Sequence, residues 1–294
     1  MSVKQAVIGA SLNIRRLISR FGSKVKRYAE TPPPLYDDPM EALYNMWDGN
    51  RASFMCELER CVTYNGLEFR KGGWHPFEAT LREYECNGAS TYEGSTLQRF
   101  YESWTPANAR SALICELYSS YELTKHPSYA FVFPWEPTTI QERIRHVKRY
   151  MREEGKKFSS SITVENGYNH HGPVSEEKGQ IEYDRCVNVF NSIKSNGYKR
   201  ERGDVRVTIL RRGDEVRFLI KDGFHRTAAV SALGYSSVPA VPRHGALIDI
   251  AHVDDWPQVK KGVWSRDDAI RYFDHLFEFD SRQWAGELDL VTNT

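Results

Sequence analysis

The order of the elements predicted between residues 181 and 241 constrains the fold more than any other feature. Val205–Leu210 has the β-branched composition of a strand, and Arg212-Gly213-Asp214 joins it to a second such run, which is typical of a hairpin. Gly197 ends the amphipathic helix that precedes the hairpin. The predicted elements are helix 181–196, strand 205–210, strand 216–220, helix 227–233 and strand 238–241. This order predicts an α+β fold.

A tight turn at Asp222-Gly223 lies between the second strand and the helix that follows it. Free backbone N–H groups and the helix dipole make a helix start a binding site for anions. His225 and Arg226 stand in the first turn, where the dipole disfavours cations, so a bound anion explains them better than helix stability does. The alternative is that Asp222 merely caps the helix and that Arg226 is solvated.

Several short motifs accompany this turn. They are Asp222-Gly223-Phe224-His225-Arg226, Ala228-Ala229, Ala232-Leu233-Gly234-Tyr235, Val238-Pro239 and the upstream helix end Ser192–Tyr198. Together they resemble the signature of the ParB/sulfiredoxin superfamily, over roughly residues 155–245. Members of that superfamily bind nucleotide phosphates at this turn. The resemblance therefore implies nucleotide contacts from Gly223, Phe224, His225, Arg226, Thr227, Arg185 and His171.

Three branches of the superfamily differ at this turn. Sulfiredoxins carry a catalytic cysteine where this chain has Phe224, which argues against sulfinic-acid reduction. DNA-partitioning members have a Glu-Arg-Arg turn followed by a helical DNA-binding domain, whereas the residues after Pro239 are rich in acids and show no helix-turn-helix pattern. Kinases of free serine have Asp-Gly-His-His-Arg, which differs from this turn only at Phe224. The chain therefore resembles the serine-kinase branch most.

Phosphoryl transfer requires a base that orients the attacking hydroxyl, and cations or Mg²⁺ that hold the phosphates. Asp222 is the first candidate for the base because it stands at the strand end beside the turn, and His225 is a further catalytic candidate. The resemblance also implies a catalytic glutamate just after the first strand of the domain. We expect His171–Val174 to form that strand, and Glu182, three residues before Arg185 on one helix face, to be the glutamate.

Two alternatives to this role for Glu182 stay open. Glu176 and Glu177 lie nearer the predicted strand and compete for the catalytic position. Glu182 and Arg185 can also form an ordinary surface ion pair on a solvated helix.

The first 30 residues differ from the rest of the chain. They carry many basic residues against a single acid, Glu30, and an apolar stripe at helical spacing, which predicts a basic amphipathic helix. Such a helix can lie on an anionic membrane, dock on a partner or pack on its own domain. The domains that we predict are a basic helix over 1–30, a proline-rich linker over 31–36, a mainly helical domain over 37–154, a ParB/sulfiredoxin-like domain over 155–250 and a helical extension over 251–294.

The predicted helical domain is rich in aromatic residues and could shape an acceptor pocket. Within it we expect one strand, 129–133, with helices at 39–47, 95–103, 108–123 and 138–154.

Composition narrows the classes of function. The formal net charge of +1 counts against a nucleic-acid partner. The five cysteines form no CxxC pair, which favours reduced thiols in a cytoplasmic protein. No apolar run is long enough to span a membrane, and no secretory signal is recognisable. His170 and His171 have no third residue at a spacing typical of a metal site, so we predict no protein ligands for a metal.

These observations predict a kinase that uses ATP or ADP with Mg²⁺ to phosphorylate a hydroxyl of a small molecule or glycan. Peripheral membrane contact through residues 1–30 would suit a role in surface polysaccharide assembly. The first alternative is a non-catalytic binding protein gated by CTP or ATP, and the second is a nuclease.

Overall fold

The structure is a computed structural model that describes residues 31–47, 50–88, 91–158 and 161–291. The chain divides into two compact units, residues 1–32 and residues 33–294. The basic amphipathic helix predicted over 1–30 lies outside the described residues.

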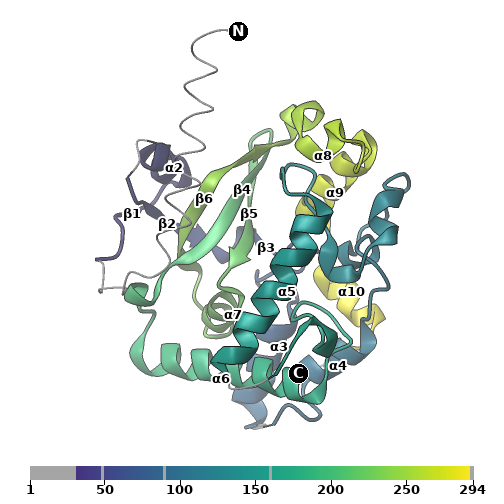
Figure 1. Cartoon of the computed structure of the whole chain (residues 1–294). Coiled ribbons are helices and arrows are strands. Elements are labelled where there is room, and N and C mark those ends of the chain that lie inside the picture. The colour runs from purple at the N-terminus through teal and green to yellow at the C-terminus, as the bar shows by residue number, and fades with distance from the viewer. Residues whose placement is uncertain (1–30, 48–49, 89–90, 159–160, 292–294) are drawn as a thin grey trace. The chain divides into compact units, whose positions relative to one another are not determined.

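The described strands form one six-stranded mixed sheet with the order β1-β2-β6-β4-β5-β3 (Figure 1). β4 pairs antiparallel with β5 and parallel with β6, and β2 pairs antiparallel with β6. The strands are β1 (Leu35–Tyr36), β2 (Ser53–Glu57), β3 (Cys61–Val62), β4 (Val205–Arg212), β5 (Glu215–Asp222) and β6 (Ser237–Asp249).

The β4–β5 hairpin forms where the sequence predicts it and leads directly to the Asp222-Gly223 turn. Gly213 takes a φ of +59° at the tip of the hairpin. β5 ends at Asp222, Gly223 takes a φ of +98°, and α7 (Phe224–Ala232) begins at the next residue. Together with α6 (Glu176–Asn196) ahead of the hairpin and β6 after α7, this confirms the predicted order and an α+β fold.

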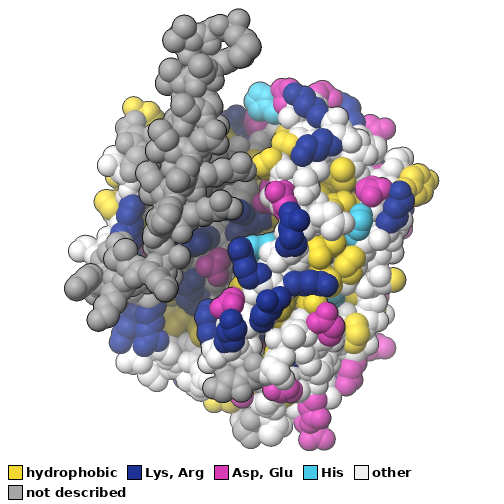
Figure 2. Space-filling view, in the orientation of Figure 1, with side chains coloured by type: hydrophobic (Ala, Val, Ile, Leu, Met, Phe, Trp, Pro, Cys, Tyr) yellow, Lys and Arg dark blue, Asp and Glu magenta, His cyan; other side chains and the backbone are white. Residues whose placement is uncertain are grey.

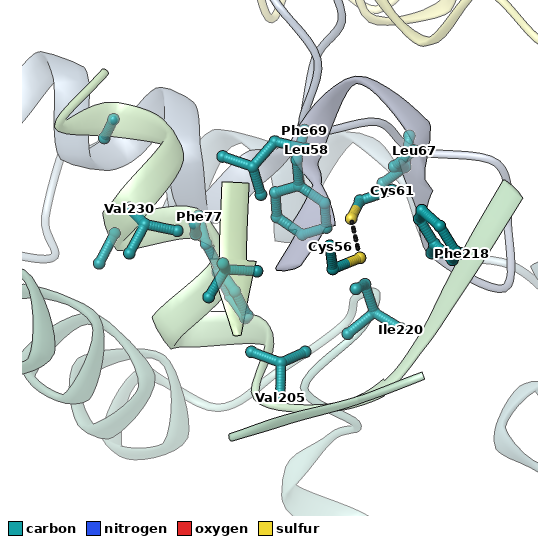
Figure 3. Packing of buried hydrophobic residues seen from close by; sticks show 14 of the residues in the cluster. Cys56, Leu58, Cys61, Leu67, Phe69, Phe77, Val205, Phe218, Ile220 and Val230 are labelled. Atoms are coloured by element: carbon teal, nitrogen blue, oxygen red, sulfur yellow. Dashed lines mark hydrogen bonds between the residues drawn. The ribbon is translucent and has the colours of Figure 1, made fainter. Parts of the chain in front are cut away.

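Neighbouring residues of the central strands pack on opposite faces of the sheet. Ile209 belongs to a core cluster with residues of α3, α4, α6 and α7, whereas Leu210 belongs to a second cluster with residues of α5 and α9. In the first cluster, Phe77 and Val230 pack beside Val205 (Figure 3). The other described helices are α2 (Pro39–Trp47), α3 (Pro76–Asn87), α4 (Thr96–Ser103), α5 (Ile140–Lys157), α8 (Pro257–Lys260), α9 (Arg266–Glu278) and α10 (Ser281–Glu287).

Three helices of the N-terminal half are confirmed. α2 has the predicted limits, and α4 begins just after Ser95, whose hydroxyl accepts from the N–H of Gln98. α5 begins with a capping box between Thr139 and Glu142. α8 to α10 likewise give the C-terminal extension its predicted helical character over the described residues.

The structure differs from the domain boundary predicted near residue 154. β1, β2 and β3 come from the N-terminal half, yet they join the sheet built by the C-terminal half. Phe54 of β2, for example, pairs with Ala240 of β6. Residues 33–294 therefore form one compact unit, and the predicted linker over 31–36 ends in β1.

The helix predicted over 108–123 is wrong. The segment forms two short 3₁₀ turns, Ser111–Leu113 and Tyr121–Lys125. Between them the backbone N–H groups of Tyr118–Ser120 donate to the carboxylate of the buried Asp268. The chain wraps around this acid, and the backbone hydrogen bonds of a helix would compete with those contacts.

The strand predicted over 129–133 is wrong as well. Residues 130–133 are all buried in the second cluster, and the indole N–H of Trp264 donates to the carbonyl of Val132 at 2.9 Å. The aromatic pattern that resembles a strand therefore reflects burial in the second cluster, where strands and helices both contribute.

The entry strand predicted over 171–174 is also not found. Gly172 lies so close to Tyr101 of α4 that a Cβ at this position would stand 1.7 Å from the carbonyl oxygen of Tyr101. The N–H of Gly172 donates to the carbonyl of Trp104. This segment therefore packs on the end of α4 and does not join the sheet.

Candidate functional site

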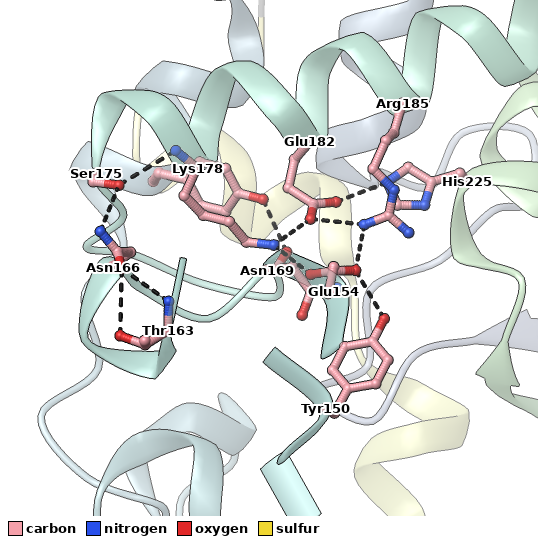
Figure 4. Close-up of polar contacts among 11 residues, drawn as sticks. Tyr150, Glu154, Thr163, Asn166, Asn169, Ser175, Lys178, Glu182, Arg185 and His225 are labelled. Atoms are coloured by element: carbon pink, nitrogen blue, oxygen red, sulfur yellow. Dashed lines mark hydrogen bonds and ion pairs between the residues drawn. The ribbon is translucent and has the colours of Figure 1, made fainter. Parts of the chain in front are cut away.

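A buried group of charges lies where α5, α6 and α7 meet (Figure 4). α6 places Lys178, Glu182 and Arg185 on one face because they are four and three residues apart. Lys178 Nζ lies 2.5 Å from Glu182 Oε1 and 2.7 Å from Glu154 Oε2 of α5. Arg185 Nη1 lies 2.9 Å from Glu182 Oε1 and 2.6 Å from Glu154 Oε1. Two carboxylates and two cations therefore balance.

The charges of this group strongly influence one another because they are shielded from water. Lys178 and Glu182 are fully buried, and Glu154 is 5% exposed. Burial alone would raise the pKa of the Glu182 carboxyl, but the hydrogen bond from His225 and the charges of Arg185 and Lys178 lower that pKa well below its ordinary value. Glu182 is therefore ionised at neutral pH.

His225 of α7 connects this group to the glycine turn. Its Nε2 lies 2.9 Å from Glu182 Oε2, and its ring stacks on Phe77 with centroids 4.7 Å apart. An ionised carboxylate only accepts hydrogen bonds, so Nε2 carries a proton. In the neutral imidazole, Nδ1 is then the nitrogen with a free lone pair. The Glu182–His225 pair is thus an oriented base.

The start of α7 has free donors. Gly223 has no side chain that could cap the helix, and within the described residues no side chain accepts from the backbone N–H groups of residues 224–226. A Cβ on Gly223 would approach Val205 and Arg226 to about 3 Å, so glycine serves both the positive φ and the space available. These N–H groups and the positive end of the helix dipole suit an anion.

The remaining residues of the turn occupy different positions. Asp222 is exposed, and within the described part of the chain its carboxylate has no hydrogen bond or ion pair, so it does not cap α7. Phe224 packs edge-on against His170 with ring centroids 4.6 Å apart. Arg226 donates to the carbonyl of Gly203, and the hydroxyl of Thr227 donates to the carbonyl of Gly223 at 3.1 Å.

His171 lies near this site but points elsewhere. It is buried, its Nδ1 is 2.8 Å from the carbonyl oxygen of Gly172, and its ring contacts Trp104 and Tyr168. Burial lowers the pKa of His171 to about 4, so it is neutral at physiological pH.

The structure brings together three of the predicted site residues, Glu182, Arg185 and His225. Glu176 and Glu177, the alternatives to Glu182, are exposed in the first turn of α6. Lys178 and Glu154 were not among the predicted site residues. Lys178 stands four residues before Glu182, which is a detectable signal only if the helix begins ahead of Lys178, as α6 does, and not at residue 181 as predicted. Glu154 is the last residue of the helix predicted over 138–154, which is rich in basic residues. Its sequence neighbourhood gives no sign that it is buried.

The chain has no match among protein-family models, curated proteins or solved structures. Within the described ranges, no helix has the length and apolar character needed to cross a membrane. The same residues contain no cluster of three or more histidine, cysteine or acidic side chains suited to a metal ion. Function is therefore inferred from the site itself.

Proposed function

We propose that the protein is a phosphotransferase that uses ATP or ADP with Mg²⁺ and acts on a hydroxyl of a small molecule or glycan. The observation that carries this proposal is the Glu182–His225 pair, which presents an oriented imidazole in the first turn of a helix that has no side-chain cap. A general base and an anion site thus adjoin each other. The resemblance of the turn to the serine-kinase branch supports the same reading.

Each residue has a role in this proposal. The backbone N–H groups at the start of α7 bind nucleotide phosphates, and the exposed carboxylate of Asp222 is suited to Mg²⁺, which prefers oxygen ligands. His225 Nδ1 takes the proton of the acceptor hydroxyl. Glu182 is a positioning residue, because both of its oxygens are bonded and its lowered pKa makes it a poor base. Asp222 is the competing candidate for the base.

Nucleotide binding is the first test. Wild-type protein is heated with ATP, ADP, CTP or GTP, each with and without Mg²⁺. A nucleotide present at one hundred times its Kd should stabilise the fold by about 2.7 kcal/mol. Stabilisation by adenine nucleotides supports the proposal. Selective stabilisation by CTP points to the gated binding protein, and no stabilisation by any nucleotide contradicts the proposed chemistry.

The base is tested by His225→Gln and Asp222→Asn. Glutamine can still donate a hydrogen bond to Glu182 but lacks a second basic nitrogen. We expect His225→Gln to lower transfer to a panel of hydroxyl acceptors by about 10²–10⁴-fold, with nucleotide stabilisation retained. The exposed His252 provides the matched control, because His252→Gln should change neither quantity. If His225→Gln kept full transfer activity while Asp222→Asn lost it, Asp222 and not His225 would be the general base.

A further inference from the structure

A second group of cations lies beside the turn, outside the charges around Glu182. Arg143 of α5 lies over the ring of Phe131 at 4.9 Å, and Lys221 lies over the ring of Phe133 at 3.6 Å. The centroids of these two rings are 5.5 Å apart. Lys221 directly precedes Asp222. Two cations therefore stand on neighbouring aromatic rings next to the proposed phosphate site.

Positive charge is in excess here. Glu136 lies 3.1 Å from Lys221 and 3.4 Å from Arg243, whereas Arg143 has no ion pair among the described residues. Lys221 and Arg243 thus share one carboxylate, and Arg143 adds a third positive charge near Lys221. Burial and the neighbouring Arg243 and Arg143 outweigh Glu136 and lower the pKa of Lys221 to about 8. Figure 2 shows further Lys and Arg side chains gathered along α5 on this face.

Two buried donors in this region lack acceptors. The hydroxyl of Tyr64, a residue that is 4% exposed, has no hydrogen bond within the described residues, and neither does Nε of Arg143. Arg143 Nη2 donates to the hydroxyl of Tyr168 at 3.2 Å. The rings of Tyr168 and Tyr64 both pack against His170, at 5.0 and 5.5 Å. Buried polar groups are nearly always paired, so these donors suit a ligand with acceptor oxygens.

His170 connects these donors to the proposed catalytic helix. Its ring contacts Tyr64 and Tyr168 and also Phe224, the residue before His225. Burial lowers the pKa of His170 to about 3, so the ring is a neutral wall. A molecule held by the unpartnered donors would lie close to the first turn of α7.

We propose that this region binds the acceptor of the transfer reaction, and that the acceptor carries a phosphate group besides its hydroxyl. The inference rests on the proposed function and extends it to the substrate class. Phosphate suits the site better than a carboxylate does, because it offers more acceptor oxygens and a second negative charge to the surplus cations. Arg143 and Tyr64 bind that phosphate, and they lie outside the turn that binds the nucleotide.

The experiment measures binding of inorganic phosphate by calorimetry, with and without saturating ADP and Mg²⁺. Acetate serves as the comparison for a carboxylate. The variants are Arg143→Gln and Tyr64→Phe, and the matched control is Arg145→Gln, an exposed arginine on the same helix. Tyr64→Phe removes a hydroxyl that has no partner, so its Tm should not fall.

Phosphate should bind the wild type more tightly than acetate does, and ADP should not displace it. Arg143→Gln and Tyr64→Phe should each weaken phosphate binding about 10-fold or more, whereas Arg145→Gln should leave it unchanged. Phosphate that binds all variants equally, or that ADP displaces, would overturn the inference. Failure of the phosphotransferase proposal shows itself separately, since phosphate binding would still depend on Arg143 while no nucleotide stabilises the protein and no acceptor is phosphorylated.

Discussion

Replacing Lys178 with methionine should destabilise the protein severely. Lys178 is fully buried, and its Nζ contacts both Glu154 and Glu182. In the wild type, Lys178 and Arg185 balance the two carboxylates. Without Lys178 the two carboxylates share Arg185, so one buried negative charge is uncompensated. Removing one member of a buried group of ion pairs in this way costs about 3–5 kcal/mol.

The measurement is the free energy of unfolding from urea denaturation followed by circular dichroism. Lys156→Met is the matched control on α5, because Lys156 and its partner Glu153 are 64% and 57% exposed. That surface pair should contribute less than about 1 kcal/mol. The double variant Lys178→Met/Glu154→Gln restores charge balance and should recover part of the loss.

The pH dependence of the same variant provides a second check. In Lys178→Met the two neighbouring carboxylates have one cation between them, and the excess negative charge raises the pKa of a carboxyl in the folded protein above its unfolded value. The variant should therefore be closest to the wild type at low pH and fall behind as pH rises through the raised pKa. The reasoning that these charges connect α5 to α6 would be refuted if Lys178→Met lowered the free energy of unfolding by less than about 1 kcal/mol at neutral pH. It would also be refuted if that decrease did not depend on pH.

Three further predictions concern stability. Because the folded-state pKa of Glu182 is lowered, the wild type should lose stability relative to Glu182→Gln as pH falls below about 4.3, measured by urea denaturation from pH 7 to 3. Gly223→Ala should lower the free energy of unfolding by about 1–2 kcal/mol, because an alanine is strained at the φ of +98° found there. Gly286→Ala in α10 is the control and should not lower Tm, because a Cβ at that position meets only open space. Asp268→Asn should cost about 1.5–3 kcal/mol, because it replaces a charged acceptor of backbone N–H groups with one that has a single acceptor oxygen. An unchanged Tm in Gly223→Ala or Asp268→Asn would contradict these expectations. For Glu182→Gln, the contradicting result is a difference in the free energy of unfolding from the wild type that stays constant from pH 7 to 3.

Local patterns explain why the segment from 181 to 241 was predictable. The hairpin and α7 depend on strand composition, a glycine turn and helical periodicity, all of which are readable over a few residues. β2 and β3 are different, because their sheet neighbours β6 and β5 lie far along the chain. The segment 108–123 shows the same limit, since its conformation depends on Asp268.

The residues of the candidate site likewise differ in whether a local pattern predicts them. Glu182, Arg185 and His225 follow from helical spacing and from the motif at the turn. Glu154 joins them only because α5 crosses α6, which no local pattern indicates. Burial also changes the role of Glu182, because a carboxylate with both oxygens bonded orients its neighbour and is poorly suited to accept a proton.

The pairing of β2 with β6 has a consequence for how the protein folds during synthesis. Phe54 leaves the ribosome long before its sheet neighbour Ala240, so the edge of β2 that faces β6 stays unpaired until β6 has been made, although β1 can already pair with the other edge. Contacts between residues so distant in sequence carry a large loop-closure entropy and slow folding. The apolar residues of β2 are exposed during that delay, so a chaperone that shields the nascent N-terminal half should raise the yield of folded protein.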